Sequence, residues 1–310
     1  MVEICPRLLS IQSHVVSGYV GNKSATFPLQ LLGFEVDAIN SVQFSNHTGY
    51  EHGTKGQIMN DSELQELIDG LQMNKINSFS HIINGYIGSK SFLLKLGEVV
   101  KTLKAVNPGL TYVCDPVMGD FGPGLYVPEE LLSVYKEVII PICDICIPNQ
   151  FEAELITGRK INNEEDAISV MDEFHKRGVK TIILSSTEMG DENHLVGIAS
   201  CKKSNLHTIV KINIPKFPAA FVGTGDLFTA LCTAWLYRTD NNLKLALEKT
   251  INTMQCVLER TLASANLAAK NLGAAKPSAA QMELKLIQCK DVIENPPIGV
   301  EALVLLEEKI

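Results

Sequence analysis

The stretch Gly223-Thr-Gly-Asp-Leu-Phe-Thr-Ala-Leu-Cys-Thr-Ala-Trp235 places two glycines, a hydroxyl and a carboxylate directly before an apolar run. The first turn of a helix presents unpaired N–H groups and the positive end of the helix dipole, and glycine lets a ligand approach the backbone. These residues therefore predict an anion site suited to a phosphoryl group. The Asp226 carboxylate would repel that group, but it makes sense as a base for an attacking alcohol. An ordinary helix start, with Thr224 and Asp226 as cap residues, fits the same four residues equally well.

Composition narrows the class of protein. The chain has 310 residues, of which 45% are hydrophobic and 20% charged, and its formal net charge is −8. These values fit one large or two small globular domains. Because no linker, repeat or low-complexity segment interrupts the chain, we predict a single domain over residues 1–310. An acidic chain without a basic stripe is a poor nucleic-acid binder, so a polyphosphate site must draw its positive potential from backbone dipoles, metal ions or a few lysines.

The chain shows no targeting or membrane signal. Residues 1–10 lack an apolar core after a basic start, and no run of about 18 apolar residues occurs. We therefore expect a cytoplasmic protein that does not bind a membrane and keeps its eight cysteines reduced. Cys143 and Cys146 form a lone CxxC pair. Residues three apart in a strand face opposite sides, so we interpret both as core cysteines rather than metal ligands or a redox pair.

Short apolar strands alternate with amphipathic runs, which indicates a mainly parallel sheet covered on both faces. The expected strands are 8–11, 36–42, 81–86, 110–114, 145–147 and 181–185, with a hairpin at 195–200 and 208–214. The expected helices run to Leu32, from Asn60 or Asp61 to about Leu71, over 92–103, from Pro128, over 149–156 and 167–177, and from the glycine motif to about Leu272. Ligands of such sheets bind beyond the carboxyl ends of the strands.

The first three strand ends carry hydroxyl and aromatic groups. Ser13 follows the first strand and precedes a glycine-containing loop at 18–24 that lacks the GxxxxGK[ST] pattern. The second strand leads into Phe-Ser-Asn-His-Thr-Gly-Tyr at 44–50, and the third ends at Tyr86. Aromatic, amide and hydroxyl groups together suit a planar ligand with polar edges. Ordinary surface loops and a structural histidine explain the same residues.

Carboxylates and hydroxyls follow the later strands. Asp115 and Asp120 lie five apart in a tight loop and suit a hard cation such as Mg²⁺, and Glu152 adds a second acidic site in the first turn of a helix. Phe121-Gly-Pro-Gly124 has the composition of a lid, and Ser185-Ser-Thr187 offers hydroxyls to phosphates. Turn chemistry accounts for each feature alone. Six strand ends that all carry suitable groups favour a site.

The same residues fall into six segments along the chain. They are Ser-Ile-Gln-Ser-His at 10–14, Gly-Tyr-Val-Gly-Asn at 18–22, Ser-Val-Gln-Phe-Ser-Asn-His-Thr-Gly-Tyr at 41–50, Asp-Pro-Val-Met-Gly-Asp at 115–120, Pro-Asn-Gln-Phe-Glu-Ala-Glu-Leu at 148–155 and Gly-Thr-Gly-Asp at 223–226. Together they resemble the pyridoxal kinase family of the ribokinase-like superfamily. The resemblance implies a three-layer ribokinase-like α/β fold, with a central, mainly parallel sheet between helices. It also implies ATP-dependent phosphorylation of the 5′-hydroxymethyl group of pyridoxal, pyridoxine and pyridoxamine.

The resemblance further implies a role for each candidate residue. Asp226 would be the base, and Gly223, Thr224 and Gly225 would stabilise the transferred phosphoryl group. The substrate ring would be held by Ser13, Thr48 and Tyr86, with Val20, Val42 and Phe44 around it. ATP and its cations would contact Asp115, Asn149, Glu152, Ser185 and Ser186, with Asp120 as a further metal ligand, Tyr126 over the nucleotide, and Phe217, Ala219 and Phe221 beside the adenine. The implied cations are Mg²⁺, with Zn²⁺ as an alternative, and K⁺, and the implied assembly is a cytosolic homodimer.

Two departures from the family pattern bear on these roles. Ile147 stands where a threonine is expected before Pro-Asn-Gln, which removes a hydroxyl from the cation or phosphate site, and the 120–126 loop is shorter than in the animal enzymes. Two alternatives stay open. One is a related kinase of another small alcohol, such as hydroxymethylpyrimidine or a sugar, although the aromatic set at 41–50 argues against a sugar. The other is a catalytically silent binder of B6 vitamers.

Overall fold

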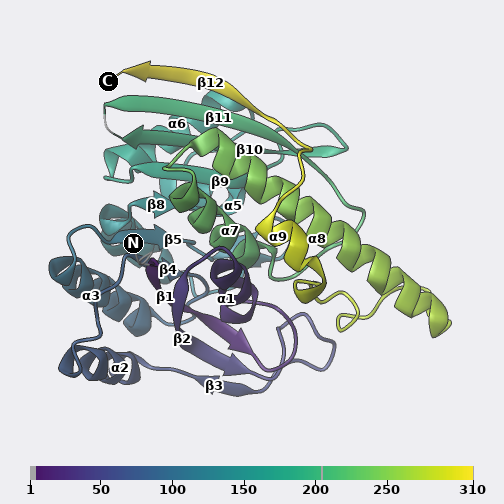
Figure 1. Cartoon of the computed structure of the whole chain (residues 1–310), viewed down its shortest axis with the longest axis horizontal. Helices are drawn as coiled ribbons and strands as arrows, with labels where there is room; N and C mark the ends of the chain where they lie inside the picture. The colour runs from purple at the N-terminus through teal and green to yellow at the C-terminus, as the bar shows by residue number, and fades with distance from the viewer. Residues whose placement is uncertain (1–4, 204, 310) are drawn as a thin grey trace.

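A ten-stranded sheet runs through the part of the chain that the computed structural model describes, residues 5–203 and 205–309 (Figure 1). Residues 1–4, within the segment where we expect no signal peptide, lie outside the described residues. The inner strands pair in parallel, and they are β1 (Arg7–Val15), β2 (Glu35–Phe44), β4 (His81–Asn84), β5 (Thr111–Cys114), β8 (Ile145–Cys146) and β9 (Thr181–Thr187). The antiparallel edges are β3 (Gly56–Ile58) beside β2, and β10 (His194–Lys203), β11 (Leu206–Pro215) and β12 (Ala302–Lys309) beyond β9. A separate small ribbon joins β6 (Gly119–Asp120) to β7 (Gly124–Leu125).

Helices cover both faces of this sheet, and each face has its own hydrophobic core cluster. One face carries α1 (Asn22–Leu31), α7 (Thr224–Arg238), α8 (Leu243–Asn271) and α9 (Lys290–Glu294). The other carries α2 (Asp61–Met73), α3 (Lys90–Val106), α4 (Leu131–Val134), α5 (Gln150–Thr157) and α6 (Glu164–Lys176). The predicted three-layer α/β arrangement, with a mainly parallel centre, is therefore confirmed. Among the described residues, no helix combines the length and apolar character needed to cross a membrane.

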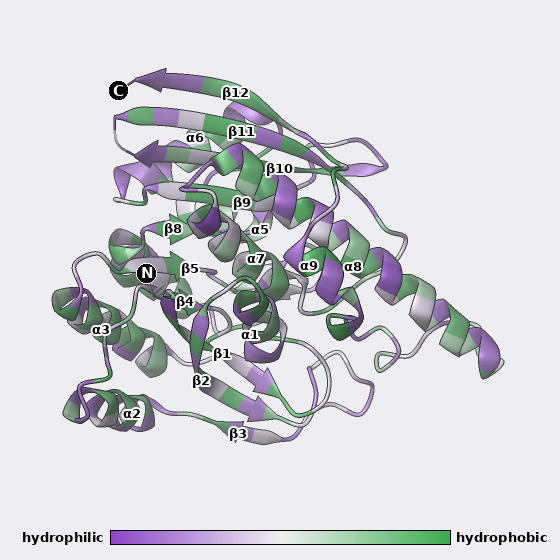
Figure 2. Cartoon of the chain, viewed as in Figure 1, coloured by the Kyte–Doolittle hydropathy of each residue, from purple (hydrophilic) through white to green (hydrophobic). Residues whose placement is uncertain are grey.

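Burial on both faces explains the apolar centres of inner strands such as β4, with residues 82–83, and β9, with residues 182–184. All four residues of β4 are buried, as are both residues of β8, and Figure 2 shows β5 and β8 in green. The edge strand β12 instead ends in exposed Glu307, Glu308 and Lys309. The sequence pattern does not predict β12, because the pairing of this strand with β11 joins segments that are far apart along the chain.

Local capping sets several helix ends where the sequence predicts them. Asn60 and Asn149 each accept a hydrogen bond from the third residue of α2 and α5, and both form capping boxes. Gly158 ends α5 at φ 72°, in the left-handed region that favours glycine. One prediction is wrong by a turn. Pro128 does not open a helix. Its carbonyl accepts a hydrogen bond from the N–H of Leu131 in a turn, and α4 begins only at Leu131.

The two cysteines of the CxxC pair are buried free thiols, as predicted, but our reason was wrong. Cys143 does not lie in a strand. It follows the short 3-10 turn Ile140–Ile142, and its thiol donates a hydrogen bond of 2.8 Å to the carbonyl oxygen of Ile145. The chain turns between Cys143 and Cys146, so the rule of alternating faces does not apply to them.

Candidate active site

Two adjoining cavities lie at the carboxyl ends of the parallel strands, at the amino-terminal end of α7. The first cavity has a volume of about 590 Å³ and the second about 410 Å³. They share Asp120, Asn149, Ser185, Phe221, Thr224, Gly225 and Phe228. This is the position at which parallel sheets bind ligands, because the loops after neighbouring strands converge there.

Every residue to which the resemblance assigns a role lies in the wall of one of these cavities. Thr187, the third of the hydroxyls offered to phosphates, lines neither cavity, because its buried side chain donates a hydrogen bond of 2.9 Å to the carbonyl of Val196. Of the residues with an assigned role, those that line only the first cavity are Ser13, Val20, Val42, Phe44, Thr48, Tyr86, Asp115, Tyr126, Glu152, Gly223 and Asp226. Those that line only the second cavity are Ser186, Phe217 and Ala219. The remaining residues with an assigned role belong to the shared wall. The structure thus brings the set together, and the role of each residue stays a prediction.

The shared wall is organised by the start of α7. Gly223 precedes the helix at φ 82°, and a Cβ there would lie 2.1 Å from the carbonyl oxygen of Tyr19. Only glycine permits both this conformation and this contact. Ser24 also donates a hydrogen bond of 3.1 Å to the Gly223 carbonyl. The first N–H groups of α7 are therefore held beside the cavities, where they can bind an anion.

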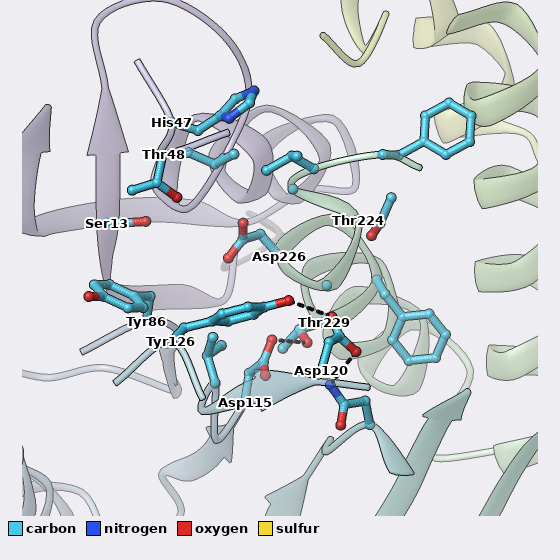
Figure 3. A pocket seen from close by; sticks show the side chains of 18 of the residues that line it. Ser13, His47, Thr48, Tyr86, Asp115, Asp120, Tyr126, Thr224, Asp226 and Thr229 are labelled. Atoms are coloured by element: carbon cyan, nitrogen blue, oxygen red, sulfur yellow. Dashed lines mark hydrogen bonds between the residues drawn. The ribbon is translucent and has the colours of Figure 1, made fainter. Parts of the chain in front are cut away.

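Asp226 points into the first cavity, with Ser13, Thr48 and Tyr86 on one side of it and Thr224 on the other (Figure 3). The N–H of Gly21 donates a hydrogen bond of 2.7 Å to Asp226 Oδ2. Burial raises the pKa of Asp226 to about 6, against the opposing effect of the Gly21 hydrogen bond. A carboxylate with this pKa is ionised near neutral pH and is a stronger base than an exposed aspartate.

Three further carboxylates lie along the floor of the first cavity. Thr229 Oγ1 donates to Asp115 Oδ2 at 3.0 Å, and Glu152 accepts the N–H groups of Met118 and Asn149, each at 2.9 Å. Burial, followed by repulsion from Glu152 and Asp226, raises the pKa of Asp115 well above its usual value. Burial likewise raises the pKa of Glu152 to about 8. A cation bound beside these two carboxylates would lower both pKa values, against the effect of burial.

Asp120 completes this group from the β6–β7 ribbon. Its carboxylate accepts hydrogen bonds from Tyr126 Oη at 3.1 Å and from Asn149 Nδ2 at 3.0 Å, both drawn in Figure 3. Burial raises the pKa of Asp120, although the Tyr126 hydrogen bond lowers it. The hydroxyl of Tyr126 is therefore held at Asp120, although the side chain as a whole is exposed.

The residues that line the two cavities include more acidic than basic side chains. The first is lined by four carboxylates and by no lysine or arginine, and the second adds only Lys216 opposite Glu188. Within the described residues, no three His, Cys, Asp or Glu side chains converge closely enough to cage a metal ion. Mg²⁺ does not need such a cage, since it binds through one or two carboxylates together with phosphates and water. The donors present fit a divalent ion that arrives with a polyphosphate.

Sequence reasoning missed several residues of the site. Thr229 follows Asp226 by three positions on α7, so helical spacing alone could have nominated it. Lys216 and Glu188 also border the second cavity, and they form an ion pair of 3.1 Å. The face of α8 that closes the second cavity gave no signal, because its apolar residues look like core residues. They include Ile251, Met254 and Leu258.

Comparisons with known proteins agree with this geometry. A protein-family model described as phosphomethylpyrimidine kinase matches residues 85–270. The pyridoxal kinase of Bos taurus is 51% identical over 98% of this chain and 100% of its own length, and that of Homo sapiens is 49% identical over the same shares. The chain belongs to the pyridoxal kinase family. This membership confirms the predicted family.

The pyridoxal kinase fold is shared as well. The solved structure of pyridoxal kinase from Leishmania donovani in complex with ADP and pyridoxamine has a TM-score of 0.88 at 32% identity. The match covers 97% of this chain and 100% of that one. The predicted ribokinase-like α/β fold is therefore confirmed along essentially the whole chain.

Proposed function

We propose that this chain transfers the γ-phosphoryl group of ATP to the 5′-hydroxymethyl group of pyridoxal, giving pyridoxal 5′-phosphate, and that it accepts pyridoxine and pyridoxamine as well. The observation that carries the proposal is the place of Asp226, which lies in the first turn of α7 and lines a cavity that also carries hydroxyl groups. Family membership supports it, and so do the complexes of the Leishmania donovani enzyme with ADP and pyridoxamine and with ADP and pyridoxine.

The chemistry asks the protein mainly for positioning and electrostatic stabilisation. In the proposed reaction Asp226 accepts the proton of the attacking hydroxymethyl oxygen. The N–H groups around Gly223, Thr224 and Gly225 stabilise the charge that develops on the transferred group. Ser13, Thr48 and Tyr86 hold the pyridine ring, and burial raises the pKa of Tyr86 so that its hydroxyl stays a hydrogen-bond donor.

Cations have a defined place in this proposal. Asp115, Asp120, Glu152 and Ser185 would hold Mg²⁺, or Zn²⁺ in its place, which when bound offsets the charge of the phosphates. Support comes from the excess of carboxylates over basic groups in the cavity walls. K⁺ would rely on backbone carbonyls and the Ser185 and Ser186 hydroxyls, because Ile147 offers only a hydrocarbon side chain.

The second cavity would take the nucleoside. Phe217 and Phe221, whose ring centroids lie 6.0 Å apart, would border the adenine together with Ala219. Asn149, Ser185 and Ser186 would contact the phosphates, and Tyr126 would cover them. We also propose that residues 1–310 act as one kinase domain, supported by the continuous sheet, and that the chain works as a cytoplasmic homodimer, supported by the family resemblance.

The direct test is whether the purified chain forms pyridoxal 5′-phosphate from pyridoxal. The absorbance of the product measures the rate. ATP should be required, a chelator should abolish the reaction, and Mg²⁺ or Zn²⁺ should restore it. The same assay with and without K⁺ tests the consequence of Ile147. Tight binding of pyridoxal without consumption of ATP would contradict the proposal.

A second acceptor is favoured by one observation, the match of residues 85–270 to the phosphomethylpyrimidine kinase model. Hydroxymethylpyrimidine is also a flat heteroaromatic alcohol, so it suits the same aromatic and hydroxyl groups. Comparing kcat/KM for pyridoxal, pyridoxine, pyridoxamine and hydroxymethylpyrimidine under identical conditions separates the two. We expect the B6 vitamers to be preferred.

A further inference from the structure

Glu283 joins two loops that line the first cavity, although it is far from both of them along the chain. Its Oε2 accepts a hydrogen bond of 2.8 Å from the N–H of Tyr19, and its Oε1 accepts one of 2.9 Å from Tyr50 Oη. His47 Nε2 lies 3.3 Å from the same Oε1. Glu283 is only 9% exposed, so these three groups replace the water that the carboxylate has lost.

The geometry of His47 shows that the contact is directional. The N–H of Gly49 donates to His47 Nδ1 at 3.1 Å, so a neutral imidazole carries its proton on Nε2, facing Glu283. The rings of His47 and Tyr50 also pack edge to face, with centroids 4.8 Å apart. The loop at 47–50 is therefore held by Glu283 through two of its side chains.

The loop at 18–21 is fitted to Glu283 just as closely. Gly18 has φ 98°, and a Cβ there would lie 2.2 Å from Glu283 Oε1. Because Gly18 has no side chain, the Glu283 carboxylate has room to reach the Tyr19 N–H. Burial by itself would raise the pKa of Glu283, but the hydrogen bonds from His47, the Tyr19 N–H and Tyr50 lower it, which keeps the side chain an ionised acceptor.

Both loops bear directly on the proposed reaction. The N–H of Gly21 holds Asp226, and the carbonyl of Tyr19 meets Gly223 at the start of α7. Val20 lines the first cavity from the same loop, and His47 and Thr48 line it from the other. A shift of the loop at 18–21 would move the pocket wall together with the hydrogen bond to Asp226, and a shift of the loop at 47–50 would move the wall at His47 and Thr48. The second cavity takes no residue from these two loops.

We propose that Glu283 is a positioning residue for the alcohol substrate, which ties the loop at 18–21 to the loop at 47–50 and so fixes the wall of the first cavity against Asp226. The inference rests on the proposed function, because it assumes that the first cavity binds the alcohol. It assigns to Glu283 an effect on the alcohol site and none on the nucleotide site.

The experiment compares E283A, E283Q and Y50F with E301Q, a control that makes the same glutamate-to-glutamine change at an exposed position. Steady-state kinetics give KM for pyridoxal and for ATP. Calorimetry gives the Kd for pyridoxal without ATP, and thermal unfolding gives Tm. We expect E283A to raise both the KM and the Kd for pyridoxal about tenfold, which corresponds to about 1.4 kcal/mol, and to leave KM for ATP unchanged. E283Q and Y50F should raise the same two constants by about threefold, since each loses only part of the contact set. E301Q should match the wild type.

An unchanged KM and Kd for pyridoxal in all three variants would overturn the inference. A purely structural role would also overturn it, and this would appear as equal rises in both KM values together with a lower Tm. If E283A does not fold, E283Q and Y50F decide the matter by the same criteria. Failure of the proposed function looks different, because the wild-type chain would then form no pyridoxal 5′-phosphate. The pyridoxal Kd of the variants would still test the inference.

Discussion

The first and second cavities share a wall, but the side chains that line them differ in chemical character. The first is lined by four carboxylates, three neutral hydroxyl-bearing residues around the proposed ring site, and backbone N–H groups held by glycines. The second is bordered by the hairpin of β10 and β11 and by α8, with apolar side chains and one ion pair. Carboxylates and N–H groups that are held in place beside a cavity interact strongly with a reacting group, whereas apolar contacts contribute binding. Changes in the first cavity should therefore affect turnover, and changes in the second should affect nucleotide affinity.

The largest expected effect is at Asp226. D226N keeps the size of the side chain and its contact with the Gly21 N–H, but it removes the proton acceptor. We expect turnover to fall by about 10²–10⁴-fold, the usual range for a general base, while the Kd values for pyridoxal and for an ATP analogue stay close to the wild type. Steady-state kinetics and calorimetry check the two halves of this expectation. Near-full activity of D226N would remove Asp226 from the mechanism.

The pH dependence should show the same group. Burial raises the pKa of Asp226 to about 6, and the base acts only when ionised. The value of kcat/KM should therefore fall as the pH drops through 6, by about tenfold per pH unit below it, and should be level above it until another group titrates. The profile of kcat/KM for pyridoxine between pH 5 and pH 8 measures this, because kcat/KM reports the ionisation of the free enzyme, and Tm is recorded at each pH to exclude unfolding. A flat acidic limb in the wild type would contradict the assignment.

A smaller effect, on affinity alone, is expected in the second cavity. Phe217 packs edge to face with Phe221 and lines the proposed adenine site. F217A should raise KM for ATP by about fivefold to tenfold, because one aromatic contact and its buried area are lost. It should leave kcat and KM for pyridoxal unchanged. A fall in kcat of the size expected for D226N would show that the two cavities are not separable in the way proposed.

The same contrast explains what the sequence could predict. Tyr86 and Asp115 come shortly after the buried strands β4 and β5, so the strand pattern alone assigns them to the carboxyl ends of the parallel strands, where Asp226 also lies. Glycine at Gly223 is informative because its conformation is rare for other residues. These signals are local, and local signals survive in a single sequence.

The missed residues depend on contacts between distant segments. Glu283 reaches Tyr19 across the fold, and the face of α8 beside the second cavity shows the same apolar spacing as any core helix. The start of α4 and the conformation at Cys143 were mispredicted for a related reason, since a turn of irregular backbone leaves no periodic pattern. Neither strand pairing of β12 nor the approach of a carboxylate to Gly18 can be read from neighbours in the chain.

The smallest expected effect is at Lys216, the one basic residue among those lining either cavity, histidine aside. Its ammonium group pairs with Glu188 at 3.1 Å, and the two side chains are 31% and 62% exposed. An exposed pair contributes little, because solvent screens it and both side chains are free to move. K216M should therefore raise KM for ATP by less than about fivefold, with kcat unchanged, if backbone N–H groups and cations provide most of the phosphate binding. Titration of the variant with ATP at low and high salt measures this. If K216M raises KM for ATP much more than high salt raises it in the wild type, Lys216 must leave Glu188 and contact the phosphates directly. The second cavity would then share the charged character of the first.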